Sequence, residues 1–348
     1  CVVLADNRNT ASSTARRLMP WLNLLLVLIL LGIGIWYLAG KVSLADIASA
    51  LRLADPVPIL IGIGMMLLTV LLKAWRWQFM FVGPEQKPNY SASFWALMLG
   101  QYVNLIVPFF RLGEVARIYA LNRQTNISMA RSIGTLVVEK VLDIVVLMLL
   151  IAVIMPVVIL PQSIGLPEPT LWLLPLFALA ALYVLAFRTE TITALLRNIA
   201  GRLPDSGWLQ RPFNWAISGL EGLAALRSGR TSLVLVLLSV LIALLSIALP
   251  FVLFFAFDLQ LTLVQAALIH VVVTIATTPP STPGKIGIFN GAVALMLYSF
   301  GVADDALIIS YSIVFHLVVI LPQIVLGSIA VAKTDWHWHR ALEQQSVS

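Results

Sequence analysis

Residues Gly100–Leu149 read GQYVNLIVPFFRLGEVARIYALNRQTNISMARSIGTLVVEKVLDIVVLML. They combine apolar sequence typical of membrane spans with a cluster of charged residues. The ionisable residues of interest are Arg111, Glu114, Arg117, Glu139, Lys140 and Asp143. A charge at the centre of a bilayer costs about 2.5–3.5 kcal/mol on insertion scales, so each of these side chains needs a partner or water. They are therefore the first candidates for a functional site.

The composition is that of an integral membrane protein. Of the 348 residues, 60% are hydrophobic and 11% are charged, and the mean hydropathy is +0.97. A soluble domain carries about 25% charged residues. The net charge of +6 is explained by bases in cytoplasmic loops, so we do not expect nucleic acid as a partner. The single cysteine, Cys1, excludes an internal disulfide and a thiolate metal site.

Six apolar segments are long enough to cross a bilayer, which takes about 20 apolar residues. They are Met19–Ala39, Val57–Phe81, Thr135–Val157, Leu171–Phe187, Ser232–Phe257 and Ala306–Ala332. Two further segments, Ser91–Val107 and Leu261–Thr278, each run into a Pro/Gly break that is followed by a second helical piece. We expect one membrane domain, 19–332, between the tails 1–18 and 333–348.

Loop charges indicate how the two interrupted segments lie. The bases between Arg76 and Arg131 all stay cytoplasmic only if Ser91–Val107 enters from that side and turns back. The second segment starts at Asp258, and the loop that follows its hairpin carries Asp304 and Asp305 and no base, so Leu261–Thr278 returns to the outer side. The sequence therefore predicts an all-α polytopic fold of the cell membrane, plasma or inner. It has six transmembrane helices, two oppositely oriented re-entrant helical hairpins and both termini in the cytoplasm.

A shift of 171 residues relates the two halves of the chain, because it carries Pro108 onto Pro279 and Gly113 onto Gly284. The same shift places the segments of 57–157 on those of 228–332. Since the halves are oppositely oriented, they are predicted to form an inverted repeat. In secondary transporters with this architecture, broken helices meet near the bilayer midplane and hold the substrate.

The two breaks predict a polar cavity, because non-helical backbone at membrane depth must be buried in protein or line a cavity. The residues that make the breaks are Pro108, Gly113, Pro279, Pro283 and Gly287. Helices that restart there would point free N–H groups inward, which suits a phosphate or a carboxylate. The substrate-binding candidates of the second half are Thr282, Gly284, Lys285, Asn290 and His316. The alternative is that the breaks only turn the chain.

The charges of the first half form two stripes with helical spacing. One stripe, on the first hairpin, consists of Arg111, Glu114 and Arg117, and the other, on the next span, consists of Glu139, Lys140 and Asp143. We expect these six to bind substrate. An equally favoured hypothesis is an electrostatic clamp that holds the hairpin to the span, in which Glu114 and Arg117 pair with Lys140 and Glu139. The two roles are compatible.

Other polar residues are interpreted as structural. The bases Lys73 and Arg76 are expected to reach the cytoplasmic face beside Trp75 and Trp77, as an interfacial anchor. His270 is expected to be a hydrogen-bonded interior residue. No catalytic motif, P-loop or metal-ligand cluster occurs in the sequence, so we expect no enzyme activity, cofactor or metal.

Several of these motifs resemble a known family. Asn104-Leu-Ile-Val-Pro108, Arg111-Leu-Gly-Glu114, Val137-Val-Glu-Lys-Val-Leu-Asp143 and Pro283-Gly-Lys-Ile-Gly287 are similar to those of the flippase-like membrane domain, the lysylphosphatidylglycerol synthase transmembrane region. The resemblance extends from about Trp21 to Ala332. The family pattern has Arg in place of Lys140, Gly in place of Lys285 and an acid in place of Asn290, and Arg is common in place of His316.

The resemblance implies a stand-alone form without the soluble aminoacyl-transfer domain, and hence movement of a lipid rather than its synthesis. We expect a lipid translocase that moves an anionic or modified phospholipid, or a polyprenyl-linked lipid, between leaflets. A homo-oligomer or a lipid-modifying enzyme partner stays open. The alternatives are a membrane glycosyltransfer enzyme or accessory that uses a polyprenyl-phosphate donor through outward acids such as Asp46, and a small-solute secondary transporter.

The predicted topology is open to a direct test by cysteine labelling in intact cells. Cysteines that replace Lys87 and Arg123 should be labelled from the same face, because the hairpin between them enters and leaves on one side. Cysteines that replace Asp258 and Asp304 should be labelled from the other face. Labelling of the first two positions from opposite faces would contradict both the hairpin and the inverted repeat.

Overall fold

The computed structural model describes residues 54–81, 87–107, 112–125, 127–154, 189–201, 229–279 and 282–334, together with Ala48 and Arg52. These residues form nine α-helices and one short 3-10 helix, and they contain no strand. Several predicted features lie outside the described residues, namely Met19–Ala39, Asp46, Pro108, Arg111, Leu171–Phe187 and the tails 1–18 and 335–348.

The first half contains four helices, α3 (Pro56–Phe79), α4 (Tyr90–Ile106), α5 (Leu112–Gln124) and α6 (Met129–Ile154). The carboxylate of Asp55 accepts a hydrogen bond from Val57 N and caps α3, and the amide oxygen of Asn89 caps α4 through Ala92 N. At 1.5 Å per residue, α3 is about 36 Å long, whereas α4 and α5 are about 26 Å and 20 Å long. Of these three, α3 alone exceeds the hydrocarbon core of about 30 Å.

The same order recurs in the second half, with α10 (Gly229–Ala256), α11 (Leu263–Thr277), the 3-10 turn η3 (Pro283–Lys285), α12 (Ile288–Ser299) and α13 (Asp305–Lys333). A short helix, α8 (Thr189–Ala200), precedes them. Thr262 and Gln265 form a capping box at the start of α11, and Asp304 caps α13.

The helix bounds agree with five predicted segments to within three residues, as α3, α4, α10, α11 and α13 show. The sixth, α6, begins at Met129, six residues before the predicted Thr135. Met, Ala and Arg favour helix, so the helix continues past the apolar sequence into polar surroundings.

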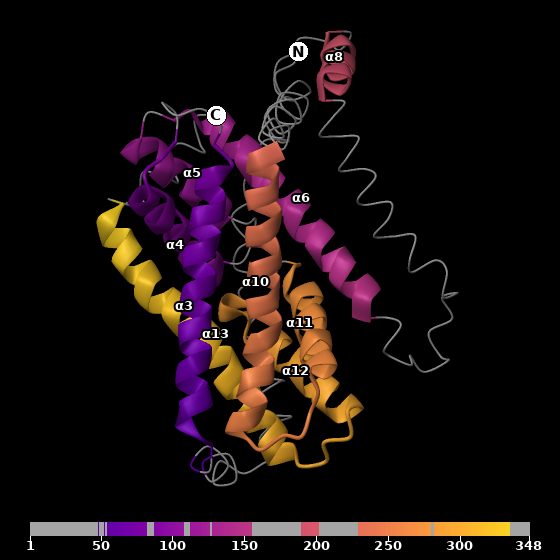
Figure 1. Cartoon of the computed structure of the whole chain (residues 1–348). Coiled ribbons are helices and arrows are strands. Elements are labelled where there is room, and N and C mark those ends of the chain that lie inside the picture. Colours follow the sequence, from indigo (N-terminus) through magenta and orange to yellow (C-terminus); the bar gives the residue numbers. More distant parts are fainter. Residues whose placement is uncertain are drawn as a thin grey trace, which may run out of the picture.

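Helices α3 and α10 pack antiparallel (Figure 1). At one end Asp55 N donates to the carbonyl of Ala256 at 2.9 Å, and further along α3 Leu72 packs against Leu238 and Ile242. The first helices of the two halves therefore run in opposite directions.

Packing contacts in one half have counterparts in the other. Helix α4 packs on α5 as α11 packs on α12, and across the halves α4 packs on α13 as α11 packs on α6. In Figure 1, α4 and α5 lie toward one end of the α3–α10 pair, and α11 and α12 lie toward the opposite end. This pairing of contacts is what two oppositely oriented copies of one helical unit would produce.

Three of the described helices, α3, α10 and α13, are long and apolar enough to cross a membrane. Their outer faces carry exposed large apolar side chains such as Leu60, Leu237 and Leu317, which suits contact with lipid. Helix α6 has 26 residues, but charged side chains interrupt its apolar sequence. The described part is therefore that of an all-α membrane protein.

The contact between α4 and α5 leaves no room for a side chain. Gly113 N donates to Asn104 Oδ1 at 2.8 Å, which draws the start of α5 onto α4. A Cβ on Gly100 would lie 2.7 Å from Gly113 O and 3.0 Å from Arg117 Cβ. The hairpin therefore depends on small residues where its helices cross.

We expect Gly100→Ala to destabilise the protein by about 1–3 kcal/mol, because overpacking forces the two helices apart. Gly64→Ala is the matched control, since Gly64 lies in the interior of α3 with nothing within 4 Å of an added Cβ. The control should be neutral or slightly stabilising, because Ala favours helix. The melting temperature of each variant is measured in detergent, with size-exclusion chromatography as the probe of unfolding. Equal melting temperatures for the two variants would contradict the tight crossing.

Candidate functional site

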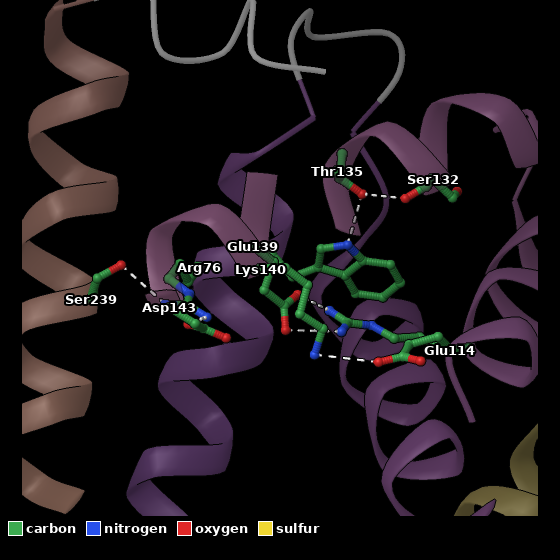
Figure 2. A network of polar contacts seen from close by, with 10 residues as sticks. Arg76, Glu114, Ser132, Thr135, Glu139, Lys140, Asp143 and Ser239 are labelled. Carbon is green, nitrogen blue, oxygen red and sulfur yellow. Dashed lines mark hydrogen bonds and ion pairs between the residues drawn. The ribbon is translucent and has the colours of Figure 1, made fainter. Parts of the chain in front are cut away.

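Three ion pairs connect α3, α5 and α6 (Figure 2). They are Arg76 Nη2–Asp143 Oδ1 at 2.7 Å, Arg117 Nη2–Glu139 Oε2 at 2.9 Å and Lys140 Nζ–Glu114 Oε1 at 3.3 Å. The three bases and three acids make a formally neutral set. The cluster therefore satisfies the charges that an apolar helix such as α6 cannot hold alone.

Arg117 is buried, with 4% of its surface exposed, and its partner Glu139 is 8% exposed. The guanidinium carbon lies 3.6 Å from the centre of the Trp77 ring, which adds a cation–π contact. The indole N–H of Trp77 donates to Thr135 Oγ1 at 2.9 Å, which anchors the ring to α6. Loss of one partner from such a pair leaves a buried charge and costs about 3–5 kcal/mol.

Both ion pairs expected between the hairpin and α6 are present, Glu114 with Lys140 and Arg117 with Glu139. Asp143 differs, because it pairs with Arg76 on α3.

The interpretation of Arg76 and Trp77 as an interfacial anchor is wrong, since Arg76 is 2% exposed and Trp77 is fully buried. The guanidinium turns inward because Asp143 accepts from Nη2 at 2.7 Å and Ser239 Oγ accepts from Nη1 at 3.0 Å. The neighbouring Trp75 is exposed.

A cavity of about 460 Å³ lies between the two halves. Its polar lining consists of Thr69, Lys73, Asn104, Glu114, Lys140, Ser246, His270, Thr274, Thr277, Thr278, Lys285, His316 and Gln323. Both halves contribute to this lining. Ligand sites commonly have volumes of about 300–1,000 Å³, so the cavity is large enough for a small ligand.

The second break forms part of the cavity wall. Helix α11 ends at Thr277, and the chain turns through Gly284 and Lys285, whose φ angles are +65° and +58°. His316 Nε2 lies 2.9 Å from the carbonyl oxygen of Gly284, and its ring stacks on Phe289 at 4.6 Å between centroids. The imidazole thus fixes the broken segment to α13.

A comparison with known protein families shows which family the chain is related to. The model of the lysylphosphatidylglycerol synthase TM region matches residues 21–327. The chain belongs to this family. A curated relative is the UPF0104 membrane protein of Methanothermobacter thermautotrophicus (strain Delta H), which is 22% identical over 312 residues. The match covers 83% of this chain and 90% of that protein. No solved structure matches the chain.

The predicted substrate-binding residues that the structure describes, which exclude Arg111, divide into two groups. Those that line the cavity are Glu114, Lys140, Gly284, Lys285 and His316. Those that lie outside its lining are Arg117, Glu139, Asp143, Thr282 and Asn290. The first three of the second group belong to the ion pairs, Thr282 bonds to the carbonyl of Ile286, and Asn290 lies 3.5 Å from Ser312 Oγ.

The residues that depart from the family pattern can be located in the structure. Lys140 keeps a positive charge where the family pattern has Arg, and it bonds to Glu114. Lys285 adds a base to the cavity where the pattern has Gly. His316, which also lines the cavity, stands where Arg is common, so the positive charge of the cavity is placed differently from the family pattern.

Lys73 and His270 line the cavity but were not among the predicted site residues. Lys73 follows Met66 and Thr69 at spacings of three and four, and all three line the cavity from α3. His270, Thr274 and Thr277 repeat this spacing on α11. A polar stripe on an otherwise apolar helix is the sequence signal that could have predicted their place in the cavity.

The described residues include no group of three or more His, Cys, Asp or Glu side chains that could hold a metal ion. What the described cavity offers is lysine ammonium groups, imidazoles, hydroxyls and one carboxylate. Such a set can bind an oxyanion by charge-assisted hydrogen bonds.

We expect Glu139→Gln to lower the melting temperature far more than Glu114→Gln. The first change leaves Arg117 buried without its counter-charge, whereas the partner of Glu114, Lys140, has 47% of its side chain exposed. Thermal unfolding of both variants measures the difference. The double variant Arg117→Met/Glu139→Gln should recover part of the loss, and its failure to do so would contradict a buried pair.

Proposed function

We propose that this protein is a lipid translocase, which moves a phospholipid or polyprenyl-linked lipid with an anionic or modified headgroup between leaflets. The observation that carries the proposal is the polar cavity of about 460 Å³ between the two halves of a membrane protein. A headgroup in hydrocarbon loses its hydration without compensation. In the cavity, ammonium groups and hydroxyls replace the lost water.

The charge of the described lining supports an anionic headgroup. Lys73, Lys140 and Lys285 contribute positive charge, and Glu114 is the one acid among the described lining residues. Family membership supports a lipid rather than a small solute, because the family is named for the membrane region of a lysylphosphatidylglycerol synthase. Acyl chains would remain in the bilayer while the headgroup crosses through the cavity.

The proposed architecture has six transmembrane helices and two opposed re-entrant hairpins, α4–α5 and α11–α12. In each hairpin both helices are about 18–26 Å long, which is shorter than a hydrocarbon core of about 30 Å. The paired contacts of the two halves support the inverted repeat. Rocking of one half against the other would open the cavity to each face in turn.

The drive for transport is proposed to be an ion gradient or mass action, since the sequence has no ATP-binding motif. Glu114 is the proposed proton carrier, because it lines the cavity, whereas Glu139 and Asp143 are engaged by arginines outside its lining. The proposal includes a location in the cell membrane with both termini cytoplasmic, no enzymatic activity, and a lipid as the partner.

Reconstituted vesicles test this function. We expect the wild type to move a fluorescent phosphatidyl lipid to the outer leaflet, and Glu114→Gln to slow this movement about tenfold, because a glutamine cannot carry a proton. Asp258→Asn is the control, since this exposed acid lies at the end of α10, outside the cavity lining, and its replacement should leave the rate unchanged.

The panel should include aminoacylated, glycosylated and polyprenyl phospholipids. Equal rates with and without protein for every lipid would rule out the translocase. A new chemical product would instead favour the glycosyltransfer alternative.

A further inference from the structure

Lys73 lies well inside α3, yet its side chain lines the cavity. It stands six residues before the end of the helix, which is about 9 Å at 1.5 Å per residue. A lysine at this depth can reach the membrane surface along the helix. Here Met66, Thr69 and Lys73 instead share one cavity-facing side of α3.

The acids near Lys73 are already paired. Asp143 and Glu139 act on Lys73 electrostatically, but the arginines Arg76 and Arg117 hold them. Lys73 itself makes no hydrogen bond or ion pair with another described residue. Because the three ion pairs of the cluster are formally neutral, Lys73 adds one positive charge in excess. A cation withdrawn from bulk water is strongly unfavourable unless an anion accompanies it.

His270 approaches the same part of the cavity from α11, in the other half of the protein. The charge of Lys73 acts on His270, so the two side chains lie within electrostatic range of each other. The expected hydrogen bond of His270 is not found among the described residues, and its side chain lines the cavity instead. Each half therefore contributes a side chain without a described hydrogen-bond partner to the cavity, Lys73 from the first half and His270 from the second.

Among the lining side chains without a described hydrogen-bond partner, the donors outnumber the acceptors. Besides Lys73 and His270, the side chains of Thr277 and Gln323 line the cavity and make no hydrogen bond with a described residue. The ammonium group offers three donors, and the imidazole, hydroxyl and amide add more. A ligand that is rich in acceptor oxygens and carries a negative charge fits this set.

We propose that Lys73 and His270 form an anion-binding subsite that takes the phosphate group of the transported molecule, with Thr277 and Gln323 as further donors. This inference rests on the proposed function and names the part of the headgroup that the cavity recognises. The phosphate bridges the two halves, because Lys73 belongs to α3 and His270 to α11. The shared chemistry is a phosphate oxyanion, whether it belongs to a lipid headgroup or is free.

Binding of short-chain probes to the purified full chain tests the subsite. The probes are dioctanoylphosphatidylglycerol, dioctanoylglycerol without a phosphate, and inorganic phosphate, and native mass spectrometry gives the apparent Kd of each. We expect the phosphatidyl probe to bind at least about tenfold more tightly than the neutral one, because charge-assisted hydrogen bonds are lost without the phosphate. Binding of inorganic phosphate through Lys73 with similar affinity would also support the subsite and assign it to free phosphate.

Variants connect this binding to the two residues. Lys73→Met should weaken the phosphatidyl probe about tenfold or more, and Lys73→Arg should retain most of the affinity, because it keeps the charge. Lys333→Met is the control, since this exposed lysine at the end of α13 is not part of the cavity, and it should bind like the wild type. Unchanged binding by folded Lys73→Met would overturn the subsite.

His270→Asn keeps the test decisive where Lys73→Met fails to fold, because it must also weaken the phosphatidyl probe, and unchanged binding would again overturn the subsite. Transport by the same variants separates the two proposals. Phosphate-dependent binding through Lys73 without any lipid movement by the wild type would keep the subsite and remove the translocase. Lipid movement by the wild type with unchanged binding and transport in Lys73→Met would keep the translocase and remove the subsite.

Discussion

The buried ion pair between Arg117 and Glu139 constrains the first half of the protein more than any other described interaction. Neither charge can be left alone in apolar surroundings, so the α4–α5 hairpin cannot separate from α6 without a large cost. Trp77 of α3 stacks on Arg117 of α5 and donates a hydrogen bond to Thr135 of α6, so it connects both α5 and α6 to α3. Because α4 packs on α13 and α3 packs on α10, the second half assembles on a surface that this pair holds in place.

The two halves share a topology but differ in what holds them together. The shift of 171 residues carries Arg117 and Glu139 onto Ile288 and Ser310, so the second half has no equivalent ion pair at those positions. Aromatic contacts take this role, since Phe289 stacks on His316 and Tyr311 stacks on Phe254. Of these contacts and the ion pairs, the ones that reach the cavity lining are the Glu114–Lys140 ion pair in the first half and the Phe289–His316 stack in the second.

Local patterns were sufficient for the described helices, because hydropathy determines them, and they offered the pairs Glu114–Lys140 and Arg117–Glu139 as one of two readings, because spacings of three or four residues place each set of charges on one helix face. They were not sufficient for Arg76 and Lys73. A base near a helix end reaches the surface or turns inward according to its partners, and the partners of Arg76 are Asp143 and Ser239 on other helices. Membership of the cavity is likewise a tertiary property, which a single helix shows only as a polar stripe.

The arrangement of Lys73 and His270 relates the site to the proposed motion. Helices α3 and α10 form a long antiparallel contact that both halves share, so rocking about this contact would keep it packed while the hairpins move. Lys73 belongs to α3, one of the two helices in this contact, whereas His270 belongs to α11 in the α11–α12 hairpin. Rocking would therefore change the distance between the two donors. A phosphate held by both in one arrangement would be held by Lys73 alone in another, which would allow its release.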